Sequence, residues 1–170
     1  GQAIVIHSRT KFIGGHNDIT AGSITGSSEL MKKIRPIYKT LGGISDPNTS
    51  WLTLRSLRTF EMRIEKQVSN AFELAKALDK HPKVKYVNYP GLESHPQHEL
   101  AKEILSNGFG AMLSFRIEDD RDTVNRFIRG LRLVRYLGTL GGIRTSLSHA
   151  ATSFRFTFSP EELESMGRYE

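Results

Sequence analysis

A short apolar run is the first feature in the pattern of hydrophobic and polar positions. Residues Ala3 to Ile6 are all apolar, and polar residues lie on both sides of the run. A short bounded run of this kind predicts a buried strand, here over residues 2–8. Residues 19–25 are the next candidate strand.

Helical patterns follow these two segments. Ser27 or Ser28 can cap a helix that continues to about Thr40, where a glycine pair ends it. A second helix begins at Asp46-Pro47, because a capping carboxylate followed by proline is typical of a helix start. We expect it to run unbroken to about Leu78, a length of about 50 Å at 1.5 Å per residue. Its apolar face comprises Leu57, Phe60, Ile64, Val68, Ala71, Ala75 and Leu78.

In the second half of the chain, segments with a strand pattern alternate with segments that have a helical pattern. Strands are predicted over residues 83–89, 111–117 and 131–137, and helices over residues 96–105 and 119–130. The order strand, helix, strand, helix, strand favours a small α/β sheet domain covered by helices.

Composition restricts the class of protein. The 170 residues are 38% hydrophobic and 25% charged, as in soluble globular proteins, and can form one domain or two small ones. No segment has the roughly 20 apolar residues of a membrane helix, and no signal-peptide pattern is present, so we expect a cytoplasmic protein with no membrane partner. The absence of cysteine excludes disulfides, thiolate nucleophiles and cysteine-ligated metals.

The charge balance is basic, with 24 Lys and Arg against 18 Asp and Glu, a net +6, and a pI of about 9.7. The densest basic segment comprises Arg126, Arg129, Arg132 and Arg135, and it is preceded by Glu118, Asp119, Asp120 and Asp122. Acids before a helix and bases toward its end suit the helix dipole, which favours a solvated helix face. Binding of nucleic acid by this face is the alternative, and it predicts a steep dependence on salt.

The candidate chemistry is concentrated around Lys11. A lysine is nucleophilic only as the neutral amine, which apolar surroundings favour, and Lys11 lies between the run at residues 3–6 and Phe12-Ile13. Ser8 and Thr10 add hydroxyls that could bind a phosphate, and the glycines at 14–15 allow a sharp turn. An imine-forming lysine beside a phosphate anchor fits this pattern. An ordinary strand end followed by a turn fits it too.

Other notable side chains have weaker chemical significance. His16, His95 and His98 lack a metal-binding spacing with nearby acids, so we predict packing or loop roles and no metal site. Trp51, at the start of the second helix, is predicted to anchor a core or a subunit interface.

The segment around Lys11, His7-Ser8-Arg9-Thr10-Lys11-Phe12-Ile13-Gly14-Gly15-His16-Asn17-Asp18, strongly resembles a known signature. It is similar to the pyridoxal-phosphate (PLP) lysine signature of the Cys/Met-metabolism, or trans-sulfuration, family. That family includes cystathionine γ-synthase, the cystathionine lyases, methionine γ-lyase and the O-acylhomoserine sulfhydrylases. The resemblance extends in order over nearly the whole chain, through residues 41–46, 51–59, 89–98, 140–143 and 149–153.

The resemblance implies a fold and a set of site residues. The fold would be α/β, the PLP-dependent transferase fold type I (aspartate-aminotransferase-like). Lys11 would carry PLP as an aldimine, and Ser8 and Thr10 would touch its phosphate. Thr139, where the family usually has serine, would lie beside the carboxylate of the substrate, an amino acid related to cystathionine, methionine or O-acylhomoserine. Arg144 stands where several members carry glutamate near the distal end of the substrate.

The resemblance also implies an organisation into domains. Residues 1–45 would be the C-terminal part of the large PLP-binding domain, 46–80 a long bridging helix, and 81–170 the small C-terminal α/β domain. The ring-stacking aromatic residue and the aspartate for the pyridinium nitrogen would precede Lys11 in relatives, so we expect a portion of a larger enzyme. That enzyme would be a homotetramer, a dimer of dimers with shared active sites. The alternative is a non-catalytic fragment that keeps the fold for oligomerisation or binding.

Overall fold

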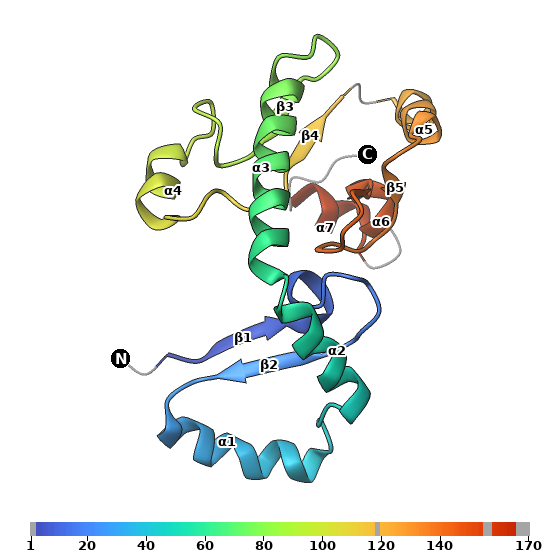
Figure 1. Ribbon diagram of the computed structural model, residues 1–170. Helices are drawn as coiled ribbons and strands as arrows, with labels where there is room; N and C mark the ends of the chain where they lie inside the picture. Colours follow the sequence, from blue (N-terminus) through green and yellow to red (C-terminus); the bar gives the residue numbers. More distant parts are fainter. Residues whose placement is uncertain (1–2, 118–119, 155–157, 166–170) are drawn as a thin grey trace. The chain divides into compact units, whose positions relative to one another are not determined.

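The computed structural model of this chain describes residues 3–117, 120–154 and 158–165. Two compact units make up the chain, one of residues 1–63 with 139–143 and the other of residues 64–138 with 144–170. Each unit is described by itself below, with the labels of Figure 1. Glu118 and Asp119, two of the acids noted before the arginine-rich helix, lie outside the described residues.

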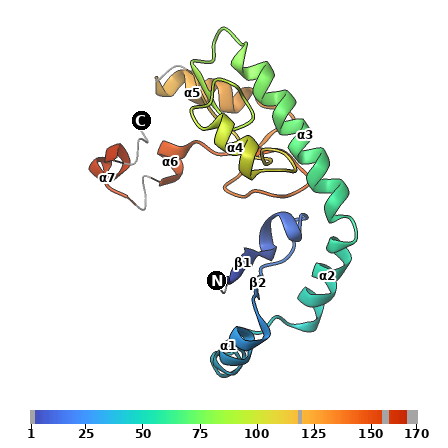
Figure 2. The same ribbon diagram turned by 90° about the vertical axis from the view of Figure 1, so that its left-hand side faces the viewer.

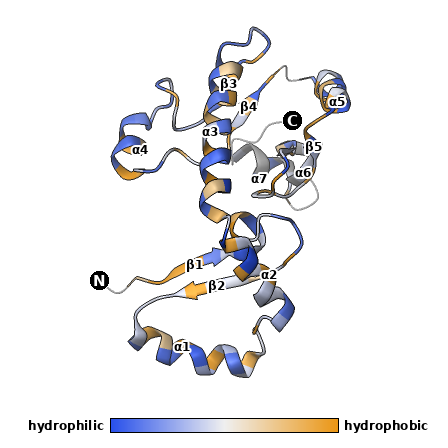
Figure 3. Cartoon of the chain, viewed as in Figure 1, coloured by the Kyte–Doolittle hydropathy of each residue, from blue (hydrophilic) through white to orange (hydrophobic). Residues whose placement is uncertain are grey.

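An antiparallel ribbon of two strands begins the first unit. β1 (Val5–Ser8) pairs with β2 (Gly22–Thr25), with His7 opposite Ser23. Both strands were predicted, but the prediction that β1 is buried is wrong, since its residues are exposed and Ile6 is 72% accessible. The apolar part of β1 is the orange stretch in Figure 3. Among the described residues β2 is its only partner strand, and an isolated two-stranded ribbon covers neither of its own faces.

The caps of the first two helices confirm the predicted starts. α1 (Ser28–Leu41) begins where Leu30 N donates to Ser27 Oγ at 3.3 Å, and it ends at Gly42, whose φ of 75° is left-handed. α2 (Pro47–Leu57) begins where Thr49 N donates to Asp46 Oδ1 at 3.0 Å. These caps satisfy amide groups that a helix leaves unpaired at its start, so neighbouring residues alone determine where the helices begin.

The cap at Asp46 predicts a pH-dependent contribution to stability. Hydrogen bonds from Thr49 lower the pKa of the Asp46 carboxyl below its usual value. The carboxylate therefore stabilises the fold above the unfolded-state pKa, and this contribution is lost as the pH falls through the lowered, folded-state value. Asp46→Ala should lower the free energy of unfolding at pH 7 and have little effect at strongly acid pH. Denaturant titrations across this range test it, and Asp46→Asn, which keeps a capping oxygen, should show a loss that varies less with pH.

The single helix predicted from Asp46 to Leu78 is wrong, because the chain forms two helices there. α3 (Phe60–Asp79) is separate from α2 (Figure 2). At the junction Arg58 N and Thr59 N donate to carbonyls three residues back, at 3.3 Å each, which tightens the last turn of α2. The Ser56 carbonyl also accepts a bond of 3.0 Å from Arg63 Nη2. The helical spacing of apolar residues continues through the junction. The break is seen in the hydrogen bonds, which change there from the regular helical pattern.

The core of the second unit packs against α3. β3 (Tyr86–Asn88) pairs antiparallel with β4 (Ser114–Arg116). The buried residues of the core cluster are Ala71, Ala75, Val87, Tyr89 and Leu92. The Tyr89 side chain is fully buried and its hydroxyl donates to the Gly110 carbonyl at 2.9 Å. Burial raises the pKa of this phenol.

Shorter elements complete the second unit. They are α4 (His98–Ile104), α5 (Arg121–Gly130), β5 (Arg135–Tyr136), β6 (Ser146–Leu147), α6 (Ala150–Phe154) and α7 (Pro160–Ser165). β5 and β6 pair in parallel and are separate from the pair β3 and β4. The three predicted strands are thus present but shorter than expected, and within the described residues they do not join into one sheet. None of the described helices is long and apolar enough to cross a membrane.

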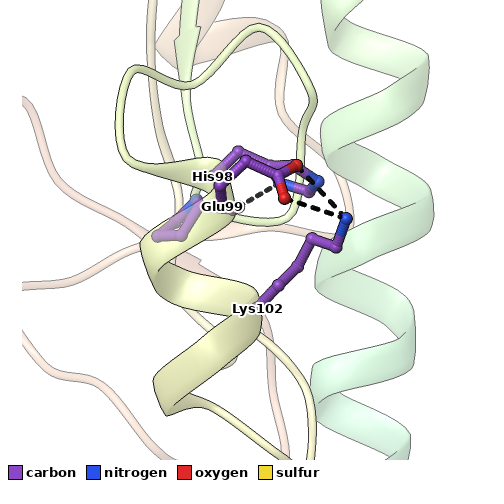
Figure 4. A network of polar contacts seen from close by, with 4 residues as sticks. His98, Glu99 and Lys102 are labelled. Atoms are coloured by element: carbon purple, nitrogen blue, oxygen red, sulfur yellow. Dashed lines mark hydrogen bonds and ion pairs between the residues drawn. The ribbon is translucent and has the colours of Figure 1, made fainter.

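His98 is used for packing within the second unit. Its Nδ1 lies 2.8 Å from the Pro90 carbonyl oxygen, and its ring stacks on Phe109 with 5.7 Å between centroids. Glu99 next to it forms an ion pair of 3.2 Å with Lys102 (Figure 4). In the part of the chain that the structure describes, no group of three His, Asp or Glu could hold a metal ion.

Candidate active site

Lys11 lies in the middle of a tight turn that follows β1, which we call the lysine turn (residues 9–15). Arg9 N and Thr10 N both donate to the Ala21 carbonyl, at 2.8 and 3.3 Å. Gly14 N then donates to Arg9 O and Gly15 N to Lys11 O, each at 2.7 Å. Residues Arg9–Ile13 form a π-helical turn interrupted by non-helical angles at Lys11 itself. Main-chain bonds therefore fix the peptides on both sides of Lys11.

Ser8 at the end of β1 and Thr10 and Lys11 in the lysine turn are the candidate site residues of this part of the chain. Lys11 is half-buried, and within the described residues its amine has no hydrogen-bond or ion-pair partner. The same holds for the Ser8 hydroxyl. Thr10 Oγ1 accepts from Ala21 N at 2.9 Å and donates to Ala21 O at 3.3 Å. The amine and the Ser8 hydroxyl are thus available to a ligand, and the ribbon orients the Thr10 hydroxyl.

Gly15 is required by the shape of the turn. Its φ is 70°, a left-handed conformation that side chains disfavour. A Cβ at this position would also overlap the Arg63 guanidinium. Both the backbone angle and the space beside it therefore require glycine at residue 15.

Gly15→Ala should consequently destabilise the protein by about 2 kcal/mol or more, from the left-handed conformation and the displaced guanidinium together. Thermal or denaturant unfolding measures the loss. Gly43→Ala is the matched control, because Gly43 has open space around it and no positive φ. Equal stabilities of the two variants would contradict this view of the turn.

A loop from far along the sequence packs on the lysine turn. Gly141, with a φ of 79°, lies so close that a Cβ there would be 2.5 Å from Phe12 N and 2.6 Å from Lys11 C. Asn17 Nδ2 donates to Thr139 Oγ1 at 3.1 Å. The structure thus brings Thr139 into the same unit as Ser8, Thr10 and Lys11.

Asn17 and Arg63 were not singled out from the sequence. Asn17 has a φ of 60°, a left-handed conformation that asparagine adopts more readily than most residues. Arg63 donates to the carbonyls of Phe12 and Ile13, 50 or more residues earlier, and no local pattern indicates such a contact. Arg144 belongs to the other unit.

Comparison with known proteins identifies the family. The sequence profile described as Cys/Met metabolism PLP-dependent enzyme matches residues 1–170. The chain belongs to this family. The resemblance seen in the sequence is therefore confirmed.

Individual members of the Cys/Met metabolism family are similar over nearly the whole chain. Cystathionine gamma-synthase 1, chloroplastic, of Arabidopsis thaliana is 41% identical over 95% of this chain and 29% of its own length. L-methionine gamma-lyase of Fusobacterium nucleatum subsp. polymorphum is 37% identical over 98% of this chain and 42% of its own length. The chain thus spans well under half the length of these relatives.

A solved structure confirms the fold. The cystathionine gamma synthase of Xanthomonas oryzae pv. oryzae, in complex with aminoacrylate and cysteine, superposes with a TM-score of 0.89 and 35% identity. The match covers 96% of this chain and 42% of that one. The expected α/β architecture of PLP-dependent fold type I is therefore confirmed for this chain.

The donor set at the lysine turn fits the cofactor that names the family. Pyridoxal phosphate needs an amine for its aldehyde carbon and hydrogen-bond donors for its phosphate. Lys11 offers an amine without a competing partner among the described residues, and Ser8 and Thr10 offer hydroxyls three positions and one position before it. The long 3.3 Å bond from Thr10 to Ala21 O leaves that proton open to a stronger, anionic acceptor.

Proposed function

We propose that the full-length protein is a PLP-dependent lyase or transferase of sulfur amino-acid metabolism. It would eliminate or replace a group at the β or γ carbon of a substrate such as cystathionine, methionine or an O-acylhomoserine. The observation that supports this most is the close approach of Gly141 to the main chain of Lys11 and Phe12. It occurs in a chain that belongs to the Cys/Met metabolism family. That contact joins the lysine segment to the Thr139 loop in one unit.

Each proposed role follows from the chemistry of the side chain. Bound pyridoxal phosphate supplies an electron sink for negative charge at the substrate Cα. Lys11 Nζ would hold the cofactor covalently and, once the substrate amine displaces it, take the proton from Cα and return a proton at a neighbouring carbon. Ser8 and Thr10 would donate to the phosphate, and the Thr139 hydroxyl would hold the substrate carboxylate.

We further propose a homotetramer, a dimer of dimers with shared active sites, that works in the cytoplasm. Residues 1–45 would end the large domain, 46–80 would bridge, and 81–170 would form the small domain. Exposed apolar side chains in the first unit support burial within a larger assembly, with Trp51 at 59% and Leu54 at 65% accessible. Light scattering on the full-length protein measures the number of copies, and a monomer would contradict the proposal.

Turnover assays test the activity itself. The full-length protein is incubated with cystathionine, methionine and O-acylhomoserines, with and without added pyridoxal phosphate, and the keto-acid and sulfur-containing products are measured. We expect turnover of at least one substrate that requires the cofactor. Cofactor binding with no turnover of any of them would favour the non-catalytic alternative.

A further inference from the structure

Arg63 makes an unusual set of contacts in the first turn of α3. Its Nη1 donates to the Phe12 carbonyl at 3.0 Å, and its Nη2 donates to the Ile13 and Ser56 carbonyls at 3.2 and 3.0 Å. Its Nε donates to Thr59 Oγ1 at 3.2 Å. One side chain thus joins the lysine turn to the junction between α2 and α3, and all these residues lie in the first unit.

All four acceptors are uncharged, which separates this contact from an ordinary ion pair. A guanidinium is a planar fork of five N–H donors with no acceptor, so it can hold several carbonyls in fixed relative positions. Burial lowers the pKa of Arg63, but arginine remains protonated near neutral pH. A cation that is partly withdrawn from water is therefore used here to bind main-chain oxygens.

The two carbonyls in the lysine turn belong to the residues directly after Lys11. Their peptides set the direction in which the chain leaves Lys11, and Gly15 leaves the space that the guanidinium fills. Gly141 approaches the same segment, at Phe12 N and Lys11 C. The backbone that follows Lys11 is therefore contacted by both Arg63 and the 139–143 loop.

We propose that Arg63 is a positioning residue for the lysine nucleophile, a role that rests on the proposed function of Lys11. By fixing the Phe12 and Ile13 carbonyls, Arg63 sets where the Lys11 amine meets the cofactor and the substrate Cα. Misplacement of a reacting group by about 1 Å can cost about 10²-fold in rate. Arg63→Gln loses the charge and the fork, and its shorter side chain does not reach as far as the Nη atoms, so it removes these bonds while keeping a polar group.

The test uses the full-length holoenzyme with Arg63→Gln and Arg63→Lys. Arg129→Gln is the matched control, since Arg129 is an exposed arginine of α5. For Arg63→Gln we expect kcat to fall about 10²-fold with KM little changed, and the pH midpoint of the absorbance of the bound cofactor to shift. Arg63→Lys should recover part of both. An Arg63→Lys protein that folds with wild-type kcat and an unshifted midpoint would overturn the proposal, even if Arg63→Gln fails to fold.

A second measurement separates this inference from the proposed function. Hydrogen exchange on the cofactor-free protein reports the Gly14 and Gly15 amides, which close the lysine turn. In Arg63→Lys these amides should exchange at least about tenfold faster, as expected when one or two supporting bonds are lost. In Arg129→Gln their exchange should not change. Unchanged exchange would overturn the positioning role. Faster exchange in a protein that binds no pyridoxal phosphate would support the contact and reject the proposed function.

Discussion

Lys11→Ala should reduce turnover by the full-length protein by about 10³-fold or more and remove the visible absorbance of the bound cofactor. The amine would both hold the cofactor and transfer protons at the substrate, and general acid–base transfer alone contributes about 10²–10⁴-fold. The change should leave the fold intact, because the described contacts of Lys11 are made by its main chain. Steady-state rates and an absorption spectrum of the variant measure both effects.

Two controls make the Lys11 result specific. Lys32→Ala removes an exposed lysine from α1 and should leave rate and spectrum unchanged. A small primary amine added to the Lys11→Ala protein should restore part of the rate in proportion to its concentration, because it supplies the missing proton carrier. A Lys11→Ala protein with normal turnover would refute the assignment of the nucleophile.

Gly141→Ala should produce the next largest effect, on stability and activity together. The left-handed φ of 79° and a Cβ at 2.5–2.6 Å from the main chain of Lys11 and Phe12 leave no room for a methyl group. We expect a loss of about 2–4 kcal/mol in the free energy of unfolding. The loop should also shift away from the lysine turn, and Thr139 with it, which lowers kcat/KM by about 10²-fold.

Gly130→Ala is the comparison variant for the Gly141 experiment. Gly130 ends α5 in open space, so a methyl group there meets no neighbour. Its stability and kcat/KM should stay close to those of the unsubstituted protein. If Gly141→Ala behaved like Gly130→Ala, the close approach of the loop to Lys11 would be wrong.

Helix starts could be predicted because they depend on neighbouring residues. Ser27 and Asp46 each bond to an amide three residues ahead, so the information lies within one turn of sequence. The break between α2 and α3 could not be predicted in this way. It involves Arg63 bonding to the Ser56 carbonyl and to two carbonyls of a turn 50 residues earlier.

The burial of β1 also could not be predicted from the local pattern of residues. The apolar run at β1 indicates a strand, and a strand is present, but its exposure depends on which strands and helices lie beside it. For the candidate site, the lysine motif predicts Ser8, Thr10 and Lys11, and the resemblance predicts Thr139. The contacts that join these segments, from Asn17 and Arg63, depend on the folded chain and have little or no sequence signal.

We propose above that Lys11 carries the cofactor. The most direct measurement reduces the holoenzyme with borohydride, digests it, and locates the phosphopyridoxyl group by tandem mass spectrometry. We expect the group on Lys11 alone, within the peptide that contains the lysine turn. A phosphopyridoxyl group on another lysine, or on none, would contradict the account.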